Sequence, residues 1–144
     1  MRVLGEGISS IVYGGIDLKT NMKVAVKIMK QEYMNKFGDL ADKDFKKEVK
    51  ILKKLKGNSN IVLILDHGRR GQIAFKEKLI KTSNYVVLEF IEDSLLDICK
   101  SSGPLPESTA RSYFIQMLDG VEAMHNNSVY HRDIKLENML VDQN

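Results

Sequence analysis

The spacing of apolar residues changes period near Asp42, and this change limits the folds available to the chain more than any other feature. Residues 11–13 and 24–28 are rich in β-branched side chains and partly alternate, which predicts strands. From Asp42 onward, apolar residues recur at intervals of three and four, which predicts a helix with one apolar face. They are Phe45, Val49, Leu52 and Leu55.

Strand-like composition returns after this helix. Residues 61–65 form a short apolar run, which we interpret as a buried strand, and residues 85–90 form another strand. The polar and basic stretch 69–81 between them is expected to be an exposed hairpin connection, longer than an ordinary turn. Residues 17–21 have the composition of a turn. The order of strands, one helix and further strands predicts an antiparallel sheet with one packed helix, an α+β arrangement.

The second part of the chain is predicted to be helical. A short helix around Leu95 to Ile98 ends before Gly103, and a second helix begins with Pro106 in its first turn and runs to His125. Its apolar stripe comprises Phe114, Met117, Leu118, Val121 and Met124. We place the boundary between the two parts at residue 90, giving a first domain of residues 1–90 and a second of residues 91–144.

Composition excludes several classes of protein. The 144 residues carry a net charge of only +3, which makes no case for nucleic-acid binding. The single cysteine, Cys99, cannot form an intrachain disulfide, and it suggests a reducing compartment. The longest aliphatic run is far shorter than the roughly 20 residues that span a bilayer. No apolar stretch near the N-terminus is as long as that of a signal peptide. We therefore expect an intracellular, cytoplasmic protein without a membrane partner.

Gly5 and Gly7 lie in a turn between apolar residues, where glycine lets backbone N–H groups approach a phosphate. Three interpretations remain open for this turn alone. It can be an ordinary tight hairpin, a phosphate-covering loop between two strands, or the turn of a dinucleotide-binding oxidoreductase. The last requires a helix directly after the glycines, whereas residues 11–13 are strand-like.

Lys27 ends an apolar predicted strand, and Glu48 lies on or beside the apolar face of the predicted helix. A charged group on a half-buried surface is costly unless an opposite charge meets it. The sequence therefore predicts that Lys27 and Glu48 form an ion pair.

Residues 131–138, His-Arg-Asp-Ile-Lys-Leu-Glu-Asn, concentrate polar and ionisable groups between apolar flanks. An aspartate, a lysine two positions later and an asparagine five positions later suit phosphoryl transfer. Asp133 would accept or orient an attacking hydroxyl, Lys135 would balance phosphoryl charge, and the Asn138 amide oxygen would ligate Mg²⁺.

Taken together, the glycine turn, the Val-Ala-Val-Lys strand ending at Lys27, Glu48 and the His-Arg-Asp loop resemble the N-terminal part of a eukaryotic protein kinase catalytic domain. The resemblance covers essentially the whole chain. A lysine two positions after the aspartate, here Lys135 after Asp133, resembles the serine/threonine branch of the family. It implies a strand-built N-lobe with one packed helix, followed by the hinge continuation and the first helices and catalytic loop of a helical C-lobe. It also implies ATP and Mg²⁺ as cofactors and a protein substrate with a serine or threonine hydroxyl.

Carried over by position, the resemblance implies catalytic roles for Asp133, Lys135, Lys27 and Glu48, with Asn138 as a metal ligand. Nucleotide contacts are implied for Leu4, Gly5, Glu6, Gly7, Val12, Ala25, Lys27, Leu88, Glu89, Ile91 and Leu140. Leu88 would be the gatekeeper beside the adenine, and Glu89 and Ile91 would offer backbone groups to it. The acidic residue that would bind the ribose stays open between Asp93, Asp97 and another residue.

The sequence departs from the family pattern in several places, among them residues 92–94 of the hinge continuation, which lack the usual glycine pair. Ser10 stands where the third glycine usually lies, and the 144 residues contain no Asp-Phe-Gly segment after Asn138. We expect a fragment that binds ATP, and we expect these 144 residues alone to be marginally folded and without kinase activity. The alternative is a catalytically silent kinase-like module that binds nucleotide or acts through contacts.

Overall fold

The computed structural model describes residues 2–75 and 78–142 and contains two compact units. The first comprises Met1–Lys53 and Val62–Phe90, and the second comprises Lys54–Ile61 and Ile91–Asn144. Within the described residues, no helix combines the length and the apolar character needed to cross a membrane.

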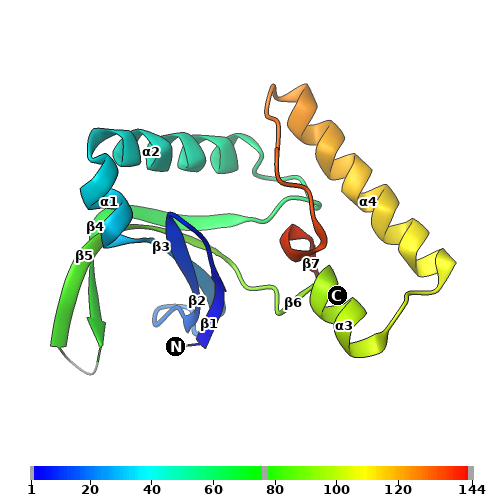
Figure 1. Cartoon of the computed structure of the whole chain (residues 1–144), viewed down its shortest axis with the longest axis horizontal. Helices are drawn as coiled ribbons and strands as arrows, with labels where there is room; N and C mark the ends of the chain where they lie inside the picture. The colour runs from blue at the N-terminus through cyan, green and yellow to red at the C-terminus, as the bar shows by residue number, and fades with distance from the viewer. Residues whose placement is uncertain (1, 76–77, 143–144) are drawn as a thin grey trace. The chain divides into compact units, whose positions relative to one another are not determined.

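The first unit is built on a five-stranded antiparallel sheet with the order β1-β2-β3-β5-β4. Its strands are β1 (Arg2–Glu6), β2 (Ser10–Ile16), β3 (Lys23–Met29), β4 (Ile64–Phe75) and β5 (Lys78–Glu89). Two helices follow β3 in the chain, α1 (Gln31–Phe37) and α2 (Asp39–Lys54), and α2 lies along one face of the sheet (Figure 1). The predicted antiparallel sheet with a packed helix is confirmed.

The core of the first unit lies between α2 and the sheet. Phe45 and Val49 of α2 are 4% and 8% exposed, and they pack with Met29, Ile64 and Val86 from three different strands. This explains why the apolar residues of α2 recur at helical spacing, because only that stripe meets the sheet. The amphipathic helix predicted from Asp42 is confirmed, although it begins earlier, at Asp39.

The short helix α1 was not expected from the sequence. Seven residues are too few for an isolated helix to be stable in water. Tertiary contacts hold it instead: the Tyr33 hydroxyl donates to Asp44 of α2 over 2.8 Å, and Ser83 of β5 contacts the Met34 sulfur. Gly38, with φ of +47°, turns the chain from α1 into α2.

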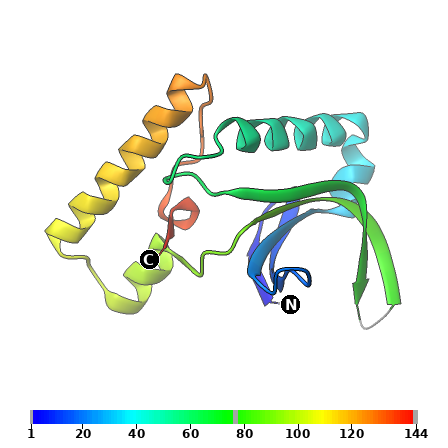
Figure 2. The same cartoon turned by 180° about the vertical axis from the view of Figure 1, so that it is seen from behind.

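The hairpin predicted over residues 69–81 is confirmed, but most of its length is paired strand and not a loop. β4 continues to Phe75 and β5 begins at Lys78, and the two strands stay paired beyond the other three (Figure 2). Residues 76 and 77 lie outside the described residues. The polar, basic composition of these residues does not indicate strands. They pair nonetheless, because backbone hydrogen bonds hold the ladder and these do not depend on the side chains.

A bulge interrupts this ladder between Gly68 and Gly71, where Arg70 has φ of +54°. The Tyr85 ring covers both glycines, so a Cβ at either position would lie 2.4–2.5 Å from its atoms. The prediction that residues 61–65 form a buried strand was also inaccurate. The strand begins only at Ile64, and Leu65 is 44% exposed.

The second unit contains two helices and a two-stranded antiparallel sheet of β6 (Asp93–Ser94) and β7 (Leu140–Val141). α3 (Leu95–Ser102) begins with a capping box between Ser94 and Asp97 and ends at Gly103, as predicted. α4 (Glu107–Asn126) is preceded by Pro106 at its N-cap, one position before the predicted first turn. A 3₁₀ turn, η1 (Leu136–Asn138), precedes β7.

One face of α4 packs against the segment of residues 54–61. A Cβ at Gly120 would lie 3.1 Å from the Asn60 carbonyl oxygen, so this contact requires a very small residue in α4. The predicted apolar stripe of α4 is only partly covered. Met124 is 8% exposed, whereas Phe114 and Leu118 are 56% and 48% exposed.

Candidate active site

The glycine turn connects β1 directly to β2. Gly7 N–H donates to the Ser10 carbonyl over 2.9 Å, and no helix follows. The predicted strand–turn–strand arrangement is therefore confirmed, and the dinucleotide-binding alternative is wrong. A Cβ at Gly5 would meet nothing within 4 Å, and one at Gly7 only the Ser10 oxygen at 3.9 Å. The surrounding protein therefore leaves room for a side chain at both positions, and neither glycine has a positive φ. Glycines at such positions are consistent with a turn that a ligand approaches closely.

Lys30, which the sequence reasoning missed, is bonded to both sides of the glycine turn. Its backbone N–H donates to the Ser9 carbonyl over 2.8 Å, and its ammonium contacts the Glu6 carboxylate at 2.5 Å. The Glu6 side chain, expected to lie at the nucleotide, therefore contacts Lys30 within the protein. The only sequence signal for this role is a cation three positions after Lys27.

Lys27 and Glu48 form the predicted ion pair. The Lys27 ammonium on β3 lies 2.5 Å from the Glu48 carboxylate on α2, and their side chains are 28% and 35% exposed. An ammonium has three N–H donors, so pairing with one carboxylate leaves donors for a phosphate. Glu48 of α2 thus holds Lys27 in place, and the remaining N–H donors of Lys27 stay available for a ligand.

The register of the sheet places other expected nucleotide contacts beside Lys27. Val12 on β2 is opposite Lys27, and Ala25 on β3 is opposite Leu88 on β5. Because strand side chains alternate between faces, these four residues share one face of the sheet. Ala25 is buried, and Val12 and Leu88 are half-buried.

Two further expected contacts in the first unit have partners of their own. Leu4 packs against Gly14, where a Cβ would lie 3.5 Å from its methyl carbon. Glu89 exchanges hydrogen bonds with Leu63: its N–H donates to the Leu63 carbonyl, and its carboxylate accepts from the Leu63 N–H. Any backbone contact from Glu89 to an adenine must therefore come from its carbonyl oxygen.

In the second unit, residues 131–138 fold into a compact loop around Asp133. The Asp133 carboxylate accepts hydrogen bonds from the Lys135 ammonium at 3.0 Å and from the Asn138 amide at 2.9 Å. The same Asn138 nitrogen donates to the Asp133 carbonyl, and Asp133 N–H donates to the His131 ring. Arg132 adopts φ of +65°, a strained value for a residue with a long side chain. The three residues predicted to carry the chemistry are thus brought together.

Two hydrogen bonds lower the pKa of Asp133 below its ordinary value of 3.8. The hydrogen bond from Lys135 is the larger cause, and the hydrogen bond from Asn138 is the next. Both donors favour the ionised form, and the carboxylate itself is largely exposed. Asp133 is therefore an anion at neutral pH. Its hydrogen bond with Lys135 is retained above pH 3.8 and is lost as the pH falls through the lowered pKa.

Replacing Lys135 with Met is expected to raise the pKa of Asp133 toward 3.8, because it removes the largest cause of the shift. Titration of the carboxyl carbon by NMR measures this directly. Lys100→Met, on the exposed end of α3, serves as the control and should leave the Asp133 titration unchanged. An unchanged Asp133 pKa in Lys135→Met would contradict the assignment.

The amide oxygen of Asn138 is the metal ligand that the sequence predicts in this loop. Its amide nitrogen is used by Asp133, which orients the amide oxygen away from that contact. Among the described residues, no group of three or more His, Cys, Asp or Glu side chains could hold a metal ion by itself. Magnesium commonly has one or two protein ligands and takes its others from phosphates and water, so a single amide oxygen is compatible with it.

The remaining expected residues lie near this loop in the second unit. Leu140 on β7 is 47% exposed and is paired with Ser94, close in sequence to Ile91. Asp97, one candidate for the ribose, accepts from the Ser94 N–H and hydroxyl in the helix cap. Its carboxylate thus has a structural use, and the choice between Asp93 and Asp97 stays a prediction.

Comparison with known proteins identifies the family. The model of the protein kinase domain matches residues 1–144. A Clostridium perfringens protein named as a probable serine/threonine-protein kinase is 36% identical over 99% of this chain, and CBL-interacting protein kinase 12 of Oryza sativa subsp. japonica is 36% identical over 99%. The chain spans 19% and 24% of these two relatives.

A solved structure supports the same assignment. Rad53 residues 1–466, in complex with AMP-PNP, matches with a TM-score of 0.75 and 26% identity over 99% of this chain and 33% of that one. The fold is that of a protein kinase domain. The chain belongs to the protein kinase domain family, and its relatives are serine/threonine kinases.

Proposed function

We propose that this chain supplies the nucleotide-binding and catalytic-loop residues of an ATP-dependent serine/threonine protein kinase. The observation that carries the proposal is the pair of arranged polar sets: Lys27 with Glu48, and Asp133 with Lys135 and Asn138. In both sets an ammonium contacts a carboxylate while the side chains stay partly exposed, so donors and acceptors remain for a ligand. In this proposal residues 1–90 form the N-lobe, and residues 91–144 form the hinge continuation and part of the C-lobe.

The first unit would bind the nucleotide. Backbone groups of Gly5 and Gly7 approach the phosphates, and the Lys27 ammonium, held by Glu48, donates to them. The apolar surface that the first unit offers to the adenine would be formed by Leu4, Val12, Ala25 and Leu88. Leu140 stays a nucleotide contact that the family resemblance implies. Glu89 and Ile91 would supply backbone groups to the adenine edge. Glu6 would act indirectly, by holding the glycine turn through Lys30.

The second unit would act on the hydroxyl that receives the phosphate. Asp133 is ionised and exposed, so its carboxylate can accept a hydrogen bond from a serine or threonine hydroxyl and orient it. Lys135, which already contacts Asp133, would offset negative charge on the transferred group. Mg²⁺ would be held through the Asn138 oxygen and would supply charge neutralisation of the phosphates.

The alternative is a catalytically silent kinase-like module that binds nucleotide or acts through contacts. Within these 144 residues the proposal assigns one metal ligand, Asn138. We therefore propose that these 144 residues on their own bind ATP without transferring its phosphate. Transfer to a peptide by the purified chain, abolished in Asp133→Asn, would contradict this part of the proposal.

Replacing Lys27 with Met is expected to weaken binding of Mg-ATP by about tenfold or more, because a charge-assisted contact to the phosphates is lost. Calorimetric titration of the chain measures the affinity. Lys19→Met, which removes an exposed lysine from the turn after β2, is the matched control and should bind as the parent chain does. Equal affinity in both variants, or no ATP binding by the parent chain, would refute the proposed nucleotide site.

A further inference from the structure

The short helix α1 follows β3 in the chain and leads into α2 (Figure 1). It contains none of the residues assigned to the nucleotide or to catalysis. Its N-cap residue is Lys30, which is bonded to both sides of the glycine turn. A helix of seven residues is stable only through its contacts with the rest of the protein. Here those contacts reach the glycine turn at one end and α2 at the other.

A continuous series of backbone hydrogen bonds joins the glycine turn to α2. Lys30 N–H donates to the Ser9 carbonyl over 2.8 Å, and the Lys30 carbonyl accepts from Met34 N–H over 3.0 Å. The Met34 carbonyl accepts from Gly38 N–H over 2.9 Å, and the Gly38 carbonyl accepts from Asp42 N–H of α2 over 3.3 Å. Moving one end of this series therefore either moves the other end or breaks a hydrogen bond, which is costly.

Side chains fasten the same helix at both ends of the series. The Lys30 ammonium contacts the Glu6 carboxylate at 2.5 Å, and the Tyr33 hydroxyl donates to the Asp44 carboxylate of α2 over 2.8 Å. Both contacts include an ionised group, which makes them stronger than hydrogen bonds between neutral groups. Tyr33 and Met34 also pack against the core of the unit. The helix is thus held to the turn, to α2 and to the core.

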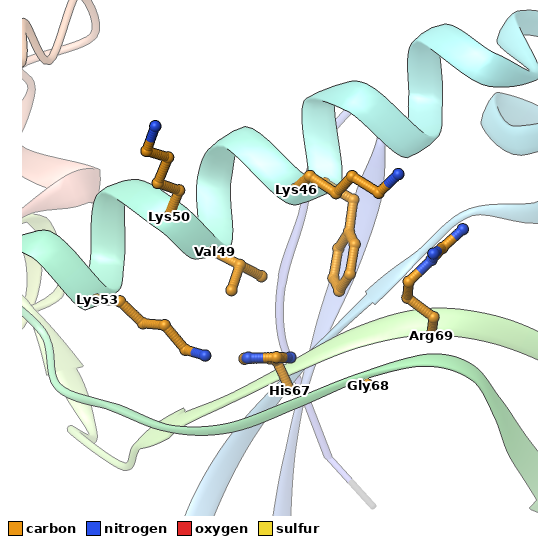
Figure 3. Close-up of a pocket in the computed structure, with 8 residues that line it drawn as sticks. Lys46, Val49, Lys50, Lys53, His67, Gly68 and Arg69 are labelled. Carbon is orange, nitrogen blue, oxygen red and sulfur yellow. The ribbon is translucent and has the colours of Figure 1, made fainter.

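α2 in turn has a fixed place against the sheet. Figure 3 shows the Val49 side chain extending from α2 toward the strands, and this side chain is 8% exposed. The Asp42 carboxylate of α2 accepts from Arg69 of β4 at 3.0 Å. α2 also carries Glu48, which holds Lys27. The position of α2 therefore fixes the Lys27 ammonium directly and the glycine turn through α1.

We propose that α1 is a rigid link between the glycine turn and α2, and that Lys30 and Tyr33 are positioning residues for the phosphates of a bound nucleotide. This inference rests on the proposed function, which assigns the glycine turn and Lys27 to those phosphates. Neither positioning residue touches the nucleotide. They act by holding the N–H groups of the turn in register with the Lys27 ammonium before the ligand arrives, which lowers the cost of binding.

The proposal predicts a selective effect on phosphate binding. A turn released from α2 meets the phosphates less well, so Mg-ATP binds more weakly. Adenosine has no phosphates and is assigned to the apolar surface, so its affinity should stay the same. If α1 served only to stabilise the fold, a change in it would weaken both ligands alike.

The test titrates the full 144-residue chain with Mg-ATP and with adenosine by calorimetry. Tyr33→Phe removes one hydroxyl and keeps the ring, and Lys30→Met removes the ammonium that contacts Glu6. Each variant is expected to bind Mg-ATP about threefold or more weakly, because part of the free energy of one lost hydrogen bond appears in binding. Each should bind adenosine within about twofold of the parent chain.

Matched controls make the same chemical changes elsewhere. Lys36→Met removes another ammonium of α1, which lies over the Phe37 ring at 5.3 Å, and Tyr113→Phe removes a hydroxyl from α4. Both should bind the two ligands as the parent chain does. Lys30→Arg keeps the cation and should bind Mg-ATP within about twofold of the parent chain.

The double variant of Lys30→Met with Tyr33→Phe shows whether the two residues act through one link. If they do, the first change already releases the turn, and the second adds little to the loss of Mg-ATP affinity. Losses that multiply would mean that the two residues act independently, which would overturn the proposed link.

Amide hydrogen exchange tests the link without nucleotide. In the ligand-free chain, Tyr33→Phe should speed exchange of the Gly7 and Lys30 N–H groups by about threefold or more, while the amides between β3 and β5 exchange as before. If the parent chain binds no Mg-ATP, the proposed nucleotide site fails, and this exchange result alone decides the link. The link is overturned by unchanged exchange at the turn, by unchanged Mg-ATP affinity in both variants, or by equal weakening of Mg-ATP and adenosine.

Discussion

Replacing Asp133 with Asn is expected to slow phosphoryl transfer by roughly 10²–10⁴-fold, the usual contribution of a positioned acid–base group. Asn keeps the shape of the side chain and can still hydrogen-bond, but it cannot accept a proton. The experiment uses a chimera in which these 144 residues replace the matching segment of the rice CBL-interacting protein kinase 12, which is 36% identical. Transfer of labelled phosphate to a peptide at saturating ATP is the readout.

The chimera also separates catalysis from binding. The affinity for Mg-ATP should be unchanged in Asp133→Asn, because Asp133 is assigned to the hydroxyl and not to the nucleotide. Asp119→Asn, an exposed aspartate on α4, is the matched control and should retain full activity. A chimera with Asn at position 133 that transfers phosphate at the parent rate would remove the catalytic assignment. An inactive parent chimera would count against the proposed function of the whole chain.

Replacing Phe45 with Ala is expected to lower the free energy of unfolding of the first unit by about 3–5 kcal/mol, the usual cost of deleting a buried aromatic ring. Phe45 is 4% exposed and lies in the core formed by α2 and the sheet. Because domains are stable by only about 5–15 kcal/mol, this single change would remove a large part of the margin. Urea denaturation, with hydrogen exchange at the amides of β3 and β5, measures the loss.

Phe37 provides the control for this stability prediction. It is 37% exposed, and its ring contacts Tyr33 with centroids 4.6 Å apart, a contact that contributes about 0.5–1.5 kcal/mol. Phe37→Ala should therefore cost clearly less than Phe45→Ala. Equal losses in the two variants would mean that the core is not organised around Phe45.

The sequence predicted the fold best where burial imposes a period. Phe45 and Val49 of α2 pack in one core with Met29 at the end of β3, so the spacing of the α2 stripe carried structural information. Prediction failed for α1 and for the far parts of β4 and β5. These elements are held by a hydrogen bond from Tyr33 to Asp44 and by ladder hydrogen bonds between strands, and neither leaves an apolar pattern in the sequence.

In the candidate site, too, some contacts could be predicted from the sequence and others could not. Asp133, Lys135 and Asn138 contact one another within six residues, so their association follows from local chain geometry and could be inferred from the motif. Lys27 and Glu48 are far apart in sequence, yet their pairing was predictable because a half-buried charge needs a counterion. The contact of Lys30 with Glu6 was not predictable in this way, because Glu6 is mostly exposed and needs no partner.

The amino-acid sequence by itself determined that this chain belongs to the protein kinase domain family, because family motifs are short, local and chemically specific. Only the tertiary structure decided that Lys30 is bonded to both sides of the glycine turn and that the Tyr85 ring covers Gly68 and Gly71. Both features depend on which strand and helix surfaces come together. That outcome is set by packing across residues distant in the chain, which no local pattern records.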